Sequence, residues 1–154
     1  TQTLAQIANT AVPSVIERQR SQLLDAMVDC QFQLGGARMA VAADPDLLGA
    51  FSRFFADLGM ETVAAVTTAR SDLLEQLPLG QIIIGDLEDA EHQARQGEAQ
   101  VLVTNSHGVD IAGRLGVQLL RAGFPIYDQL IPPYRSIYWQ GTPRECETLG
   151  VLTN

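Results

Sequence analysis

The sequence predicts a three-layer, Rossmann-like α/β domain, in which a parallel sheet of about five strands has helices on both faces. Two observations lead to this fold class. Short apolar runs rich in β-branched residues alternate with segments of helical period, which is the order of βαβ units. The connections between them are short, which favours right-handed crossovers within one sheet. The predicted strand order is 3-2-1-4-5, so the first and fourth strands are neighbours.

Length and composition limit the function classes. The 154 residues fit one domain with a sizeable core, and a 46% apolar content argues against disorder. A formal net charge of −8 and the absence of lysine argue against a nucleic-acid partner, which would need clustered basic side chains. No apolar run approaches the roughly 20 residues that span a bilayer, so we expect no membrane partner.

The chain opens with Thr1 and shows no signal peptide, so we expect a fragment of a longer chain. Its two cysteines, Cys30 and Cys146, form neither a CxxC nor a zinc pattern. We therefore expect no metal site, with Cys30 as a small buried hydrophobic residue and Cys146 as an inert thiol. A reducing cytoplasm is the simplest setting for such a chain.

Residues 1–36 are expected to form leading helices. A short helix precedes Pro13, and a longer one runs from Pro13 to about Phe32 and is broken by the glycine pair at 35–36. An apolar stripe on the longer helix should pack across the sheet or join an upstream region. The stripe consists of Ile16, Leu23, Leu24, Met27 and Val28.

Residues 37–128 are expected to form the α/β domain. After the first strand, Arg38–Ala43, Asp44 should cap the next helix with its carboxylate, and Pro45 suits the first helical position. The leucines and phenylalanines of that helix keep a strict helical period as far as Gly59, so we interpret them as core. The further strands are expected at Glu61–Thr67, Gln81–Gly85, Val101–Thr104 and Val117–Arg121, with helices capped by Ser71 and Asp86 and a helix ended by Gly116.

Residues 129–154 carry Pro, Gly and aromatic residues without a helix or strand period, so we expect an irregular carboxy-terminal tail. In a doubly wound sheet, ligands and partners meet the carboxyl ends of the strands. The loops Ala43–Asp46 and Thr104–Gly108 should therefore flank one crevice. The segment Arg121–Pro125 lies at another such strand end.

The chemistry at these loops leaves several interpretations open. No GxGxxG follows the first strand and no Walker A motif occurs, so a nicotinamide enzyme is disfavoured. His107 could be a base, contact a ligand or partner, or make a structural hydrogen bond; catalysis is the weakest of these, because no second His or carboxylate is near it in sequence. Arg121 could be paired with a neighbouring carboxylate or offered to an anion.

The acidic residues have two interpretations each. Asp44 and Asp46 could act as a carboxylate pair, but capping explains Asp44. The run Asp86, Glu88, Asp89 and Glu91 is typical of a solvated helix face near a helix N-terminus, and a basic docking partner is the alternative.

Two motifs together resemble the last domain of the nitrogenase component 1 family. The string VTNSHGVDIAGRLGVQLLRAGFPIYD is similar to a strand–NS(H/Y)G–helix–strand–RxGFPxxD pattern, and ADPDLLGAFSRFFADLGMETVAAV is similar to the opening strand–DPD–helix–LG–strand unit. The resemblance spans roughly residues 12–128. GDLEDAEHQA, ERQRSQLLDAMVD and His107, where catalytic β subunits have Tyr, make it most similar to the NifN-type subunits of the cofactor-assembly scaffold.

The resemblance implies a scaffold domain that works through subunit contacts and not a catalyst on its own. It implies a NifE-type partner in a heterotetramer, with other cofactor-assembly proteins as further partners. The full complex would hold an iron–sulfur cluster and the iron–molybdenum cofactor precursor, whereas this domain would bind no cofactor, since the family's cluster-binding cysteines belong to an amino-terminal domain. The residues that match family motif positions, expected as crevice or partner contacts, are Asp44, Asn105, Ser106, His107, Gly108, Arg121, Gly123, Phe124, Pro125 and Asp128.

Two alternatives remain. The chain could belong to the β subunit of a catalytic nitrogenase-like reductase, or it could be a stand-alone small-molecule-binding α/β domain. After Trp139 the sequence GTPRECETLGVLTN departs from the family's GYxG turn and apolar terminal helix.

Overall fold

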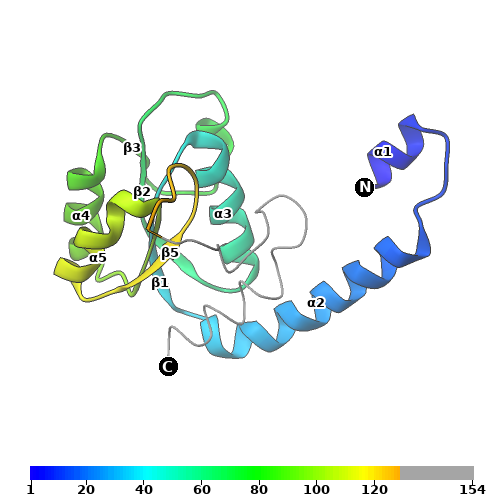
Figure 1. Ribbon diagram of the computed structural model, residues 1–154, viewed down its shortest axis with the longest axis horizontal. Helices are drawn as coiled ribbons and strands as arrows, with labels where there is room; N and C mark the ends of the chain where they lie inside the picture. Colours follow the sequence, from blue (N-terminus) through cyan, green and yellow to red (C-terminus); the bar gives the residue numbers. More distant parts are fainter. Residues whose placement is uncertain (129–154) are drawn as a thin grey trace.

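A five-stranded parallel sheet lies between two layers of helices in the computed structural model (Figure 1), which describes residues 1–128. The predicted irregular tail and Cys146 lie outside the described residues. The elements, in chain order, are α1 (Gln2–Ile7), α2 (Ser14–Leu34), β1 (Arg38–Ala42), α3 (Pro45–Asp57), β2 (Glu61–Thr67), the 3-10 turn η1 (Leu74–Gln76), β3 (Ile83–Ile84), α4 (Leu87–Gln96), β4 (Val101–Thr104), the 3-10 turn η2 (Ser106–Gly108), α5 (Val109–Leu115) and β5 (Gln118–Arg121).

The sheet has the order β3-β2-β1-β4-β5, and every neighbouring pair is parallel. The predicted fold class and strand order are confirmed. Val41 of β1 is opposite Ala65 of β2 and Val103 of β4. Because β1 and β4 are central and adjacent, the loops that follow them emerge side by side at one edge of the sheet.

Alternation along the strands divides the core between the two faces of the sheet. Met39 and Val41 of β1 pack with the phenylalanines and leucines of α3, whereas Ala40 packs with residues of α4 and α5. This period of two is what a strand buried on both faces requires. The phenylalanine stripe of α3 is core as predicted, since Phe51 and Phe55 stack in it with ring centroids 5.4 Å apart.

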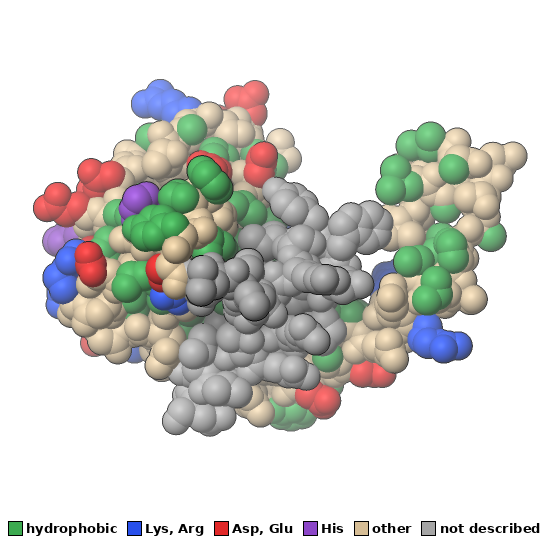
Figure 2. Space-filling model, viewed as in Figure 1, with side chains coloured by type: hydrophobic (Ala, Val, Ile, Leu, Met, Phe, Trp, Pro, Cys, Tyr) green, Lys and Arg blue, Asp and Glu red, His purple; other side chains and the backbone are tan. Residues whose placement is uncertain are grey.

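Within residues 1–128, the long helix α2 packs on the domain only near its carboxyl end. Leu34 is fully buried, and Met27 and half-buried Cys30 pack against the same core cluster as α3. Figure 1 shows the rest of α2 leading away from the sheet with α1 beyond it. Leu24 and Val28 are 51% and 55% exposed, so this part of the stripe does not pack across the sheet, and the alternative that it joins an upstream region stays a prediction. Figure 2 shows hydrophobic side chains at the surface of this arm.

Three local predictions differ from the structure. Asp44 occupies the N-cap position of α3, with Pro45 in the first turn, but its side chain accepts no capping hydrogen bond. The helix expected after Ser71 is only the short turn η1, although the Ser71 hydroxyl accepts from Leu73 N at 3.3 Å. The third strand is reduced to two residues, because only Ile83 and Ile84 pair with the edge of β2.

Candidate functional site

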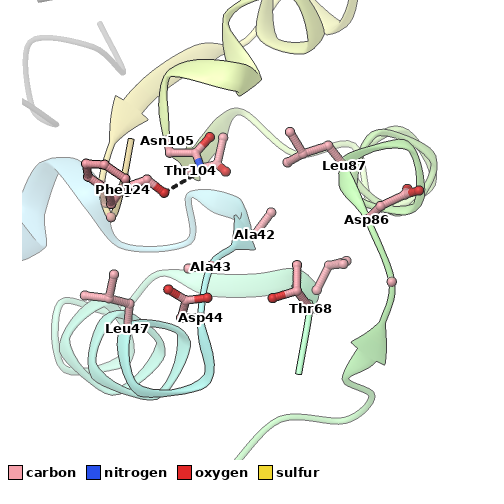
Figure 3. Close-up of a pocket in the computed structure, with 14 residues that line it drawn as sticks. Ala42, Ala43, Asp44, Leu47, Thr68, Asp86, Leu87, Thr104, Asn105 and Phe124 are labelled. Carbon is pink, nitrogen blue, oxygen red and sulfur yellow. Dashed lines mark hydrogen bonds between the residues drawn. The ribbon is translucent and has the colours of Figure 1, made fainter. Parts of the chain in front are cut away.

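A pocket of about 230 Å³ opens at the carboxyl edge of the sheet (Figure 3). Residues at or just after the ends of all five strands contribute to it. Its position between the loops after β1 and β4 is the switch point at which doubly wound folds bind ligands. The lining residues are Ala42, Ala43, Asp44, Leu47, Val66, Thr68, Gly85, Asp86, Leu87, Thr104, Asn105, Ala122, Gly123 and Phe124.

The Asp44 carboxylate is at the exposed side of this pocket. Among the described residues it makes no hydrogen bond or ion pair, because it does not fold back onto the first turn of α3. Asp86, on the opposite side, is different. Its carboxylate accepts from Glu88 N at 2.8 Å and from Asp89 N at 3.2 Å, and Asp86 N donates to Asp89 Oδ2, which completes a capping box on α4. The Asp86 carboxylate is therefore already hydrogen-bonded within the domain, whereas the Asp44 carboxylate has no such partner among the described residues.

Thr104, the last residue of β4, is 1% exposed and lines the pocket. Its hydroxyl has no hydrogen-bond partner among residues 1–128. Its γ-methyl packs onto Gly108, where a β-carbon would come within 2.1 Å of it. Gly108 is thus required by close packing and not by backbone strain, since its φ is −79°.

The loop after β4 is bonded to the loop after β5. The Asn105 side chain makes two bonds: Oδ1 accepts from His107 N at 3.1 Å, and Nδ2 donates to Phe124 O at 3.0 Å. Ser106 N donates to Pro125 O at 3.0 Å, and the peptide bond before Pro125 is cis. We call the segments Asn105–Gly108 and Arg121–Asp128, joined in this way, the loop clasp.

A network of hydrogen-bonded charged and polar side chains completes the loop clasp. Arg121 Nε donates to Asp128 Oδ2 at 2.7 Å, and the hydroxyl of Ser106, 2% exposed, donates to the other oxygen of the same carboxylate. The hydrogen bond from Arg121, followed by that from Ser106, lowers the pKa of Asp128 to about 2. Of the two alternatives for Arg121, pairing with a neighbouring carboxylate is the one that the structure shows.

The outer surface of the loop clasp carries exposed rings. Phe124 is 89% exposed and Tyr127 is 62% exposed. The His107 ring lies edge-on to Tyr127, with ring centroids 5.4 Å apart, and Tyr127 Oη is 3.3 Å from His107 Nδ1. Figure 2 shows a histidine beside exposed hydrophobic side chains on this face of the domain. No carboxylate contacts His107 within the described chain, so the geometry does not form a catalytic pair.

The predicted site residues separate into two groups. Four of them, Asp44, Asn105, Gly123 and Phe124, line the pocket. The others, Ser106, His107, Gly108, Arg121, Pro125 and Asp128, belong to the loop clasp beside it. Their roles as crevice or partner contacts stay predictions.

Sequence reasoning missed several residues. Thr68 and Leu87 line the pocket, and Tyr127 contacts His107. Thr104 was placed in a loop expected to flank the crevice but was not selected as a site residue. The strand-end rule that selected Asn105 could also have selected Thr104 and Thr68, since each is at the carboxyl end of a predicted strand. Glu91 was expected on a solvated face, but it is held by Arg114, with Nε–Oε2 at 3.1 Å, and by Arg95.

Residues 1–128 contain no group of three or more His, Cys, Asp or Glu side chains that could hold a metal ion. Cys30 is the one cysteine within this range and lies on α2, outside the pocket. These residues do not fit an iron–sulfur cluster, whose ligands are several thiolates. No helix in the described part of the chain is long and apolar enough to cross a membrane.

The fold and pocket define a doubly wound α/β domain that lacks a dinucleotide fingerprint and has a pocket at its switch point, beside the bonded loops that follow β4 and β5. A family model described as nitrogenase component 1 type oxidoreductase matches residues 1–140. The chain belongs to this family.

Three relatives share the name nitrogenase iron-molybdenum cofactor biosynthesis protein NifN. The protein of Bradyrhizobium diazoefficiens is 43% identical over 140 residues, which cover 90% of this chain and 30% of the relative. Those of Klebsiella pneumoniae and Nostoc sp. are 45% and 46% identical, over 82% and 84% of this chain and 28% and 29% of the relatives. The chain thus spans about 30% of the length of these relatives.

A solved structure titled "Nitrogenase Cp1 at pH 6.5" has the same fold. It superposes with a TM-score of 0.85 over 99% of this chain and 36% of the solved chain, at 25% identity. The arm formed by α1 and α2 is therefore included in the likeness.

Proposed function

We propose that this chain is the carboxy-terminal domain of a NifN-type scaffold subunit, which with a NifE-type partner supports assembly of the nitrogenase iron–molybdenum cofactor in the cytoplasm. The observation that carries the proposal is the identity of 43–46% to proteins of that name over 82–90% of the chain. The cofactor precursor is the cargo of such a scaffold, and this domain would support its handling through contacts with other parts of the assembly.

The geometry supports a contact role. The loop clasp holds Phe124 and Tyr127 exposed on a segment that is bonded to the loop after β4, where Asn105 Nδ2 donates to Phe124 O and the Ser106 hydroxyl accepts from Tyr127 N. Rigid, exposed aromatic side chains are what protein interfaces use as anchors, because their contact area costs little conformational entropy.

Copurification tests the proposal. The full-length protein is expressed with a tagged NifE-type subunit, and we expect a stable complex that supports cofactor maturation in a purified assembly reaction. Phe124→Ala with Tyr127→Ala should weaken the complex, whereas Val109→Ala, at a side chain 38% exposed on the neighbouring helix, is the matched control. If both subunits fold and no complex forms, the proposal is wrong.

A second candidate is the β-subunit domain of a catalytic nitrogenase-like reductase, favoured by the fold shared with the solved nitrogenase chain. Its identity is 25%, against 43–46% for the relatives named NifN. Complementation separates the two. A strain that lacks its nifN-type gene should recover cofactor synthesis with the scaffold subunit, and one that lacks a catalytic β subunit should not.

A further inference from the structure

We propose that the pocket at the carboxyl edge of the sheet binds a small organic cation, a guanidinium or ammonium group on a short apolar stem. The inference goes beyond the proposed function and does not depend on it. Three features carry it: an open pocket at the switch point of the sheet, a carboxylate at its exposed side with no partner among the described residues, and a buried hydroxyl in its wall that also has none.

The charged residues that line the pocket indicate that the ligand is positively charged. Within residues 1–128, no Arg, Lys or His side chain lines the pocket, whereas Asp44 and Asp86 do. An anion would meet these carboxylates without a compensating cation, so like-charge repulsion disfavours it. Asp86 is already bonded to two backbone amides of α4, so Asp44 is the acceptor left for a cation.

The hydrogen-bond requirement of the ligand follows from Thr104. A hydroxyl that is 1% exposed normally has a partner, because an unpaired buried polar group costs free energy. Thr104 Oγ1 has none within the described chain, and the γ-methyl of the same residue is turned to Gly108. Figure 3 shows the Thr104 side chain in the pocket wall, across the pocket from Asp44. A ligand with an N–H group could satisfy this hydroxyl.

The other residues that line the pocket indicate how large the ligand is and that its stem is apolar. Apolar side chains of Ala42, Leu47, Val66 and Leu87 form much of the wall, so they would contact carbon atoms. The volume of about 230 Å³ corresponds to roughly eight water-sized groups at about 30 Å³ each. Both an arginine side chain from a partner protein and a free alkylguanidine have this chemistry.

Calorimetric titration of the full-length protein with agmatine, a guanidinium on a four-carbon stem with a terminal amine, tests the inference. We expect saturable one-to-one binding, weaker binding of butylamine, and none of inorganic phosphate. Asp44→Asn should weaken agmatine binding at least about ten-fold, because a charge-assisted contact is lost. Thr104→Val should weaken it by roughly two- to ten-fold, as for a neutral hydrogen bond.

Two matched controls keep structural effects apart from ligand contacts. Thr67→Val removes a second buried hydroxyl without a described partner, 1% exposed on β2, which does not line the pocket. Asp46→Asn removes a carboxylate from the same first turn of α3, also outside the pocket. Both should bind agmatine within about two-fold of the parent. If the Thr104→Val variant does not fold, the agmatine affinities of the Asp44→Asn and Asp46→Asn variants still test the inference. Both substitutions are at exposed sites and should leave the fold intact.

A repeat of the titration on the complex with the NifE-type subunit distinguishes the two sources. Binding that persists in the complex identifies a free small cation as the ligand. Binding that is lost in the complex identifies a basic side chain of the partner as the occupant. No saturable agmatine binding by the protein alone, equal binding by the Asp44→Asn and Asp46→Asn variants, or tighter binding of phosphate would overturn the inference.

Discussion

Replacement of Gly108 by alanine tests whether the NSHG turn depends on close packing. The new methyl group would be 2.1 Å from the γ-methyl of Thr104, with Leu102 and Leu119 at 3.6 Å. Thr104 is buried in the sheet and cannot move aside, and the Gly108 backbone, at φ −79°, is open to any residue. The cost is therefore one of overpacking, about 1–3 kcal/mol. For a chain of this size that is about 2–4 °C in melting temperature per kcal/mol.

Gly113→Ala is the matched control, on the helix that follows. A β-carbon there meets nothing within 4 Å, and its position inside α5 favours alanine by about 0.5–1 kcal/mol. The two glycine variants should thus shift the unfolding midpoint in opposite directions, in urea or thermal unfolding followed by far-UV circular dichroism. Thr104→Ser removes the colliding methyl, so the double variant should recover much of the loss from Gly108→Ala. Equal stability of both glycine variants, or no recovery with Thr104→Ser, would refute the packing explanation.

Three further predictions concern the electrostatic contacts. Asp86→Ala should destabilise the protein by about 1 kcal/mol in urea unfolding through loss of the α4 capping box, whereas Glu88→Ala, on the same turn, should change stability little. Glu91→Gln should lower the midpoint more than Glu88→Gln does, because only Glu91 bonds to Arg114; equal effects would contradict this. Asp128 has a depressed pKa, so its contribution to stability should be complete above its ordinary value of 3.8 and lost as the pH falls toward about 2; a carboxyl NMR titration with a midpoint near 3.8 would contradict it.

The fold could be predicted because its determinants are local and repeated. The run Val101–Val103 is apolar at every position, which a strand needs when both its faces are covered. The Asp86 capping box was visible in part for the same reason, since its donors are two and three residues away. The order of strands then follows from handedness and short connections, without reference to particular side chains.

The site could be predicted only in outline, because its bonds join residues distant in sequence. Ser106 and Asp128 are separated by 22 positions, and they meet only because β4 and β5 are neighbours. Asp44 shows the opposite limit. Its local sequence pattern predicts that the carboxylate caps α3. A cap contributes only about 1 kcal/mol, so the surroundings decide whether the side chain bonds to the first turn of the helix or faces the pocket. The apolar stripe of α2 likewise shows that a surface is suited to burial without showing what covers it.

The arrangement separates residues that maintain the site from residues that are available to a ligand. Ser106, Arg121 and Asp128 bond to one another, so a substitution among them should change stability and binding together. Asp44 and Thr104 have no side-chain hydrogen bond within the described residues, so their substitution should change binding with little loss of stability. Double variants that combine one substitution from each group would therefore show whether the two effects on binding are independent. Independent effects would mean that the loop clasp contacts partners directly, and coupled effects would mean that it maintains the shape of the pocket beside it.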